Sequence, residues 1–386
     1  RLRSRGLGDV YKRQIFSNQL TYKGMTIDIF CDVIDNFGDA GVCWRLASIF
    51  SREHGFPVKL YINDAQTLSK ITSGLDPKNL PCLVDGIEIH DWKDAETSEP
   101  SQVVIETFGC RLPYAFEQKI ASARPQPIWI NLEYLSAEDW VEGCHSLPSP
   151  HPSLNVNKYY FFPGVTKKTG GLMIEKDLFI RQKHFSKDRN KFLEAFNLDP
   201  EVFTTFVFCY PSAPLAKFYK ALQKRGKDIN LLLPKGAATE ILSKLYKEHP
   251  SRNIHLGISE MVPQSEFDKF LWASDAVIIR GEDSFVRAQL SGKPFIWNIY
   301  PQTEETHIKK LEAFGERIRP FYGASYQAWI DMNLSWNKSS SDLAPYWNRW
   351  CEELPLIKEA ALRWRDHLVS LRSLADNLLR FVKSKI

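Results

Sequence analysis

The sequence predicts two α/β domains with mainly parallel sheets, and three observations support this fold class. Short runs of β-branched and aromatic residues alternate with helix-like stretches, which is the pattern of parallel sheets. The alternation occurs twice, on either side of a passage rich in Pro, Gly and Ser. A length of 386 residues and an apolar content of 44% suit two globular domains. We therefore expect a cleft between two sheets, lined by the carboxyl ends of their strands.

The first domain is predicted over residues 25–182. The expected helix "DAGVCWRLASIFSREHG" ends at Gly55, shortly before Pro57. Residues 142–172 are expected to form loops, because Pro, Gly and Ser are frequent there. The expected strands are "TIDIFCDVI", "VKLYI", "GIEIHDW", "QVVIETF" and "QPIWINLEYL".

The second domain is predicted over residues 183–355. Its expected strands are "TTFVFCY", "INLLLP", "NIHLGI", "DAVIIRG" and "PFIWNIY". The helices expected between them are "APLAKFYKALQKRG", "AATEILSKLYKEH", "QSEFDKFLWAS" and "DSFVRAQLSG". After Pro355, apolar residues recur every three or four positions, which predicts one long amphipathic helix over about 356–386. We expect this helix to pack back on the first domain and to complete it.

The distribution of charge argues against a nucleic-acid-binding protein. Residues 1–24 hold six Arg or Lys against the single Asp9, so they carry a charge of +5. The net charge of the whole chain is +4, so the rest of the chain carries −1. A nearly neutral body does not predict nucleic-acid binding. We interpret residues 1–24 as a non-native extension, from cloning or upstream translation, outside the fold.

Cysteine usage and hydropathy predict a cytoplasmic protein. The seven cysteines are scattered without a C-x-x-C pair, as is usual for reduced thiols. No apolar run approaches the ~20 residues that a membrane helix requires.

The absence of several binding motifs narrows the range of possible ligands. The chain has no G-x-G-x-x-G after its first strand and no G-x-x-x-x-G-K-[ST], so neither a dinucleotide cofactor nor a phosphate loop is expected. It also has no D-x-D or H-x-x-x-H pair, and we expect neither a cofactor nor a metal.

Two polar constellations stand at predicted strand-to-helix turns. In "DNFGDAG", Asp35 and Asp39 flank Asn36, Phe37 and Gly38. Two carboxylates at a helix start are consistent with catalysis. The same arrangement is equally consistent with a purely structural role, in which Asp39 caps the helix and Asp35 ends the strand.

The second constellation is "RGEDS", residues 280–284. A helix that starts at Asp283 or Ser284 offers backbone N–H groups and a positive dipole end to a phosphate or diphosphate, and Arg280 adds a charged donor. Glu282 fits a role in accepting hydrogen bonds from ribose or sugar hydroxyls. The alternative is that Asp283 and Ser284 only cap the helix while Arg280 forms a surface ion pair.

Several motifs together resemble one family. "DNFGDAGVCWRLA", "FFPG", "TGGL", "FVFCY" and "RGEDSFVRAQLSGKPFIWNIYPQ" resemble elongation factor P arginine rhamnosyltransferases, the EarP family, over nearly the whole chain from Met25. The resemblance implies an inverting glycosyltransferase of GT-B architecture, with an acceptor-binding first domain and a nucleotide-sugar-binding second domain. Because Arg280 and a helix start would handle the diphosphate, we expect the enzyme to be metal-independent. The donor would be dTDP-β-L-rhamnose and the acceptor one arginine of elongation factor P.

The resemblance also implies roles for the residues. A guanidinium is protonated at working pH, so its attack on a sugar carbon requires a base. Asp39 would be that base and Asp35 would orient the guanidinium, while Glu282 would be essential on the donor side. Arg280, Asp283 and Ser284 would surround the diphosphate, and Phe37 and Gly38 would shape the sugar pocket. Asn36 and Gly281, beside them in the sequence, are also expected to bind substrate. Phe208, Tyr210, Gln264 and Phe267 suit a thymine ring, because they offer aromatic faces to stack on and an amide to read the base edge.

Two alternatives stay open. One is another sugar-nucleotide enzyme on the same fold, an epimerase or a transferase that acts on a lipid or small molecule. The other is a catalytically silent protein that binds elongation factor P. Phe208 and Phe267 are also compatible with a place in the hydrophobic core.

Overall fold

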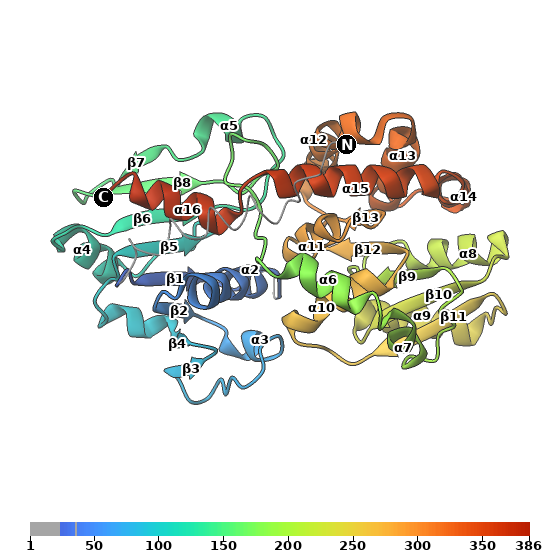
Figure 1. The fold of residues 1–386 in the computed structure, drawn as a ribbon, viewed down its shortest axis with the longest axis horizontal. Helices are drawn as coiled ribbons and strands as arrows, with labels where there is room; N and C mark the ends of the chain where they lie inside the picture. The colour runs from blue at the N-terminus through green and yellow to red at the C-terminus, as the bar shows by residue number, and fades with distance from the viewer. Residues whose placement is uncertain (1–23, 35–36) are drawn as a thin grey trace, which may run out of the picture.

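The computed structural model describes residues 24–34 and 37–386, and it contains two sheets that lie side by side (Figure 1). The first sheet has the strand order β3-β4-β2-β1-β5-β6-β8-β7. Its inner strands run parallel, and β3 and β7 are antiparallel edges. The strands are β1 (Ile27–Cys31), β2 (Val58–Ile62), β3 (Cys82–Val84), β4 (Ile87–Asp91), β5 (Val103–Thr107), β6 (Ile128–Leu132), β7 (Pro148–Pro150) and β8 (Asn157–Phe161).

The second sheet is parallel throughout, in the order β11-β10-β9-β12-β13. Its strands are β9 (Thr204–Val207), β10 (Ile229–Pro234), β11 (Ile254–Ser259), β12 (Ala276–Arg280) and β13 (Phe295–Asn298). Strands β9, β12 and β13 are buried along nearly their whole length, because helices cover the sheet, as is usual for a parallel sheet.

Helices connect the strands of both sheets. The first half contains α2 (Phe37–Ser48), α3 (Ala65–Ser69), α4 (Tyr114–Ser122) and α5 (Val141–Cys144). The remaining helices are α6 (Leu178–Phe185), α7 (Arg189–Glu194), α8 (Leu215–Arg225), α9 (Ala237–Glu248), α10 (Gln264–Ala273), α11 (Asp283–Ser291), α12 (Thr306–Tyr322), α13 (Tyr326–Asn337), α14 (Ala344–Glu352), α15 (Leu354–Ser370) and α16 (Leu374–Lys383).

The prediction of loops over residues 142–172 was partly wrong. The segment contains most of α5, the edge strand β7 and strand β8, which pairs in parallel with β6. The frequent prolines obscured these strands, because β7 begins and ends with proline and lies at an edge, where a missing N–H is tolerated.

The prediction of one long C-terminal helix was also wrong, because the chain breaks between α15 and α16. Leu371 is extended and Ser373 caps α16 by accepting from the N–H of Asp376. Helix α15 buries Trp364 in the core of the second half, and α16 buries Leu378 in the core of the first. Only α16 therefore returns to the first sheet, as Figure 1 shows along the upper side of the molecule. The predicted domain boundaries stay predictions.

Candidate functional site

The candidate base lies where three neighbouring parallel strands end. Asp39 is in the first turn of α2, after β1, and is 1% exposed. Its Oδ2 accepts from the backbone N–H of Ile34 at 2.9 Å, and its Oδ1 accepts from the hydroxyl of Tyr134 at 2.9 Å. Because α2 begins at Phe37, Asp39 lies in the first turn of the helix and not at its N-cap position.

Tyr134 and Phe108 were not predicted as site residues. Tyr134 follows β6 and Phe108 follows β5, and their rings stack with centroids 3.9 Å apart. Because β1, β5 and β6 are neighbours in the sheet, both residues lie at the same carboxyl ends of the strands as Asp39. Position at the carboxyl end of a parallel strand was the signal that could have identified them.

The rest of the first constellation is described only in part. Asp35 and Asn36 lie outside the described residues. Phe37 is half-buried beneath the Nζ of Lys70, 6.0 Å from its ring centroid. Gly38 is also half-buried, in the first turn of α2.

The second constellation forms the turn between β12 and α11. Gly281 has φ of 64°, a conformation that favours glycine, and α11 begins at Asp283. No side chain of the described residues caps this helix. The hydroxyl of Ser284 donates to the carbonyl of Arg280, which ties the turn together and differs from the expected capping role.

An aromatic cradle lies beside this turn. The guanidinium carbon of Arg280 stands 4.8 Å from the ring centroid of Phe208 and 4.7 Å from that of Tyr210. Phe267 packs edge-on against Phe208 at 5.5 Å. Tyr300, which was not predicted, packs edge-on against Tyr210 at 5.3 Å and is 61% exposed. Four aromatic rings and one cation therefore gather at the carboxyl ends of β9, β12 and β13.

Asp283 and Gln264 have partners that the sequence did not predict. Both carboxylate oxygens of Asp283 accept from Arg45 of α2, at 2.7 and 2.9 Å. The side-chain amide of Gln264 donates to the carbonyl of Gly41 at 2.8 Å and to Asp283 at 3.0 Å. The two residues thus join the halves in this structure, and their roles at the diphosphate and thymine stay predictions.

This contact belongs to a larger buried network. Glu175, on the segment between β8 and α6, pairs with Arg45 of the first half and with Arg287 of the second. Arg287 also pairs with Asp268. Burial alone would raise the pKa of Glu175, but the guanidinium groups of Arg287 and Arg45 outweigh it and hold that pKa well below its usual range.

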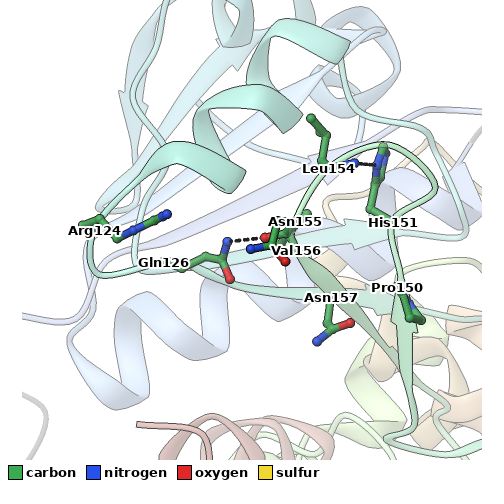
Figure 2. A pocket seen from close by; sticks show the side chains of 8 residues that line it. All are labelled: Arg124, Gln126, Pro150, His151, Leu154, Asn155, Val156 and Asn157. Carbon is green, nitrogen blue, oxygen red and sulfur yellow. Dashed lines mark hydrogen bonds between the residues drawn. The ribbon is translucent and has the colours of Figure 1, made fainter.

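A separate hollow lies on the first sheet at the amino ends of its strands, opposite the ends that carry Asp39. Figure 2 shows it around the residues that precede β6 and β8, with the amide of Gln126 donating to the carbonyl of Asn155 at 3.0 Å. It is lined by Arg124, Gln126, Pro150, His151, Leu154, Asn155, Val156 and Asn157. Since these residues lie at the amino ends of the strands, the hollow is separate from the site at Asp39.

Comparison with known proteins decides the family. A family described as "Elongation-Factor P (EF-P) rhamnosyltransferase EarP" matches residues 27–383. This chain belongs to the EarP family. It is 37% identical to a protein-arginine rhamnosyltransferase of Pseudomonas putida over 94% of this chain and 99% of the relative. It is 38% identical to one of Shewanella oneidensis over 92% and 97%.

Solved structures support the EarP assignment. A structure described as "Structural basis for EarP-mediated arginine glycosylation of translation elongation factor EF-P" matches with a TM-score of 0.63 and 25% identity, over 94% of this chain and 99% of that one. MurG of Acinetobacter baumannii matches at 0.50 and 10% identity, over 93% and 99%, which is a likeness of fold. The predicted GT-B architecture is confirmed, and this EarP-family chain is a glycosyltransferase.

The described part of the chain contains neither a membrane-spanning helix nor a cluster of metal ligands. No helix there is long and apolar enough to cross a membrane. No group of three or more His, Cys, Asp or Glu residues there could hold a metal ion.

Proposed function

We propose that the protein transfers L-rhamnose from dTDP-β-L-rhamnose, with inversion, to one arginine side chain of elongation factor P in the cytoplasm. The family and the names of its relatives support this substrate pair. One observation of the structure carries the proposal. The ion pair between Arg45 and Asp283 holds the helix that bears Asp39 against the helix that follows Glu282.

On the acceptor side, Asp39 supplies the base. The terminal nitrogen of the guanidinium attacks the anomeric carbon, a C–N bond forms, and the proton passes to the carboxylate of Asp39. Asp35 pairs with the guanidinium and orients it. A single displacement of this kind inverts the anomeric carbon.

On the donor side, the bond between the anomeric carbon and the diphosphate oxygen breaks, and dTDP leaves with the electron pair. Arg280 and the start of α11 stabilise the negative charge that develops on the diphosphate. Phe208, Phe267 and Tyr210 offer ring faces and edges to the thymine. Glu282 accepts from sugar hydroxyls.

Mass spectrometry of elongation factor P tests the proposal. The protein is incubated with dTDP-β-L-rhamnose and elongation factor P, with and without EDTA, and the acceptor's peptides are sequenced. We expect one added deoxyhexose on one arginine, under both conditions. An acceptor in which that arginine is replaced by lysine is the matched control.

Two outcomes would contradict the proposal. Donor conversion without modification of elongation factor P would support another sugar-nucleotide enzyme. Binding of elongation factor P without donor turnover would support a catalytically silent binding protein.

A further inference from the structure

We propose that Tyr134 is a positioning residue that fixes the direction of the Asp39 carboxylate, an inference that rests on the proposed function of Asp39 as base. The hydroxyl of Tyr134 donates to Oδ1 of Asp39 at 2.9 Å, while the N–H of Ile34 donates to Oδ2 at 2.9 Å. Two donors on different oxygens restrict rotation of the carboxylate about its terminal bond. A carboxylate that is held in one orientation spends a larger fraction of the time in the geometry from which it can accept the proton.

The Tyr134 ring is itself held in place. It stacks on Phe108 with ring planes 5° apart. Phe108 has φ of 58°, which is unusual for an aromatic residue, and its N–H donates to the carbonyl of Leu132 at 2.7 Å. Sparsely populated backbone conformations of this kind cost energy and tend to occur at functional sites. Here the conformation places a flat platform beneath the tyrosine.

The segment after Tyr134 is held by the other half of the molecule. Arg317 of α12 donates from Nε to the carbonyl of Ala137 at 2.9 Å. Its Nη2 pairs with Asp139 at 2.7 Å and its Nη1 with Glu142 at 3.2 Å. The donor-binding half therefore supports the segment that carries Tyr134, and the orientation of the base depends on contact between the two halves.

Tyr134→Phe tests the proposal, because it removes the hydroxyl and keeps the stack on Phe108. The matched control is Tyr219→Phe, which removes a tyrosine hydroxyl that donates to the carbonyl of His249 at 2.8 Å, on α8 at the outer end of the second half (Figure 1). Rates are measured by mass spectrometry of elongation factor P. We expect kcat to fall about 10- to 100-fold in Tyr134→Phe. The KM for the donor should stay unchanged, and Tyr219→Phe should keep the wild-type kcat.

The Asp39→Asn background separates this proposal from the proposed function. If Tyr134 acts through the Asp39 carboxylate, Tyr134→Phe should lower the residual rate of Asp39→Asn by a much smaller factor than it lowers the wild-type rate. An unchanged kcat in Tyr134→Phe, or an equal loss in both backgrounds, overturns the positioning role. A wild-type rate in Asp39→Asn instead contradicts the base itself.

Discussion

At the level of single residues, Arg280 is the cation of the proposed donor site. Among the described residues, no hydrogen bond or ion pair reaches its guanidinium, which stands over Phe208 and Tyr210. A half-buried cation without an anionic partner leaves its hydrogen-bond donors available to a ligand. The sequence prediction that Arg280 merely forms a surface ion pair was therefore wrong.

Arg280→Met should weaken binding of dTDP about 10- to 100-fold, the range for loss of a charge-assisted hydrogen bond. The melting temperature should change little, because the guanidinium gives up no ion pair. Isothermal titration with dTDP measures the first quantity and differential scanning fluorimetry the second. Arg319→Met is the matched control, since Arg319 stands 4.5 Å from the ring of Tyr326 outside the site. Equal affinity for dTDP in Arg280→Met and Arg319→Met would remove Arg280 from the donor site.

The residue types at the site could be predicted, but several of their contacts could not. Motif spacing identified the turns that carry Asp39 and Glu282, because a strand, a turn and a helix are local in sequence. The pair between Arg45 and Asp283 joins positions 238 residues apart, and a single sequence holds no signal for it. Tyr134 stands at the carboxyl end of a predicted strand, but its hydrogen bond to Asp39 depends on the order of strands in the sheet, which the sequence alone does not give.

At the scale of elements, the segment "TGGL" explains how α16 docks. Gly171 has φ of 77°, and a Cβ there would lie 2.2 Å from the carbonyl oxygen of Arg372 in the break before α16. The N–H of Leu374 donates to the carbonyl of Leu172 at 2.7 Å. The apolar period of three and four residues continues across this break, which is why the sequence predicted one continuous helix.

Gly171→Ala should destabilise the protein by at least about 2 kcal/mol, because it adds a backbone clash to the cost of a left-handed alanine. Chemical denaturation measures the free energy of unfolding. Gly226→Ala is the control: Gly226 has φ of 64°, but a Cβ there meets nothing within 4 Å. Equal losses in the two variants would mean that the clash with Arg372 is relieved without cost.

At the scale of the whole molecule, buried charges fix the two halves against each other. Arg45, Glu175 and Asp283 link α2, the connecting segment and α11, and Arg287 and Asp268 extend the network into the second half. Loss of one partner from a buried pair typically costs 3–5 kcal/mol, about the same as a large core truncation. Contact between the halves is thus part of the folded state described by the structure.

Glu175 should make this contact sensitive to acid. The pKa of Glu175 is held well below its usual range in the folded state, against about 4.3 in the unfolded chain. A carboxyl group whose pKa is lower in the folded protein than in the unfolded chain stabilises the fold at pH values above its unfolded pKa. That stabilisation is lost progressively as the pH falls from the unfolded pKa toward the folded pKa. Glu175→Gln should therefore melt well below wild type at pH 7, and the difference should narrow between about pH 5 and pH 3.

Melting curves of both proteins over this pH range measure the effect. Glu260→Gln is the control, because Glu260 pairs with Lys235 on the surface with its side chain 80% exposed, where ion pairs contribute little. A difference between Glu175→Gln and wild type that stays constant with pH would contradict the role of the charge.

The proposed role of Asp39 as the base for arginine rhamnosylation is tested by Asp39→Asn. Asparagine keeps the shape of the side chain but cannot take the proton. The measurement is the rate at which this variant rhamnosylates elongation factor P, taken beside its melting temperature. We predict a rate lower by roughly 10²-fold or more, with a melting temperature close to that of wild type. A variant that melts lower yet rhamnosylates arginine at the wild-type rate would show that Asp39 is not the base.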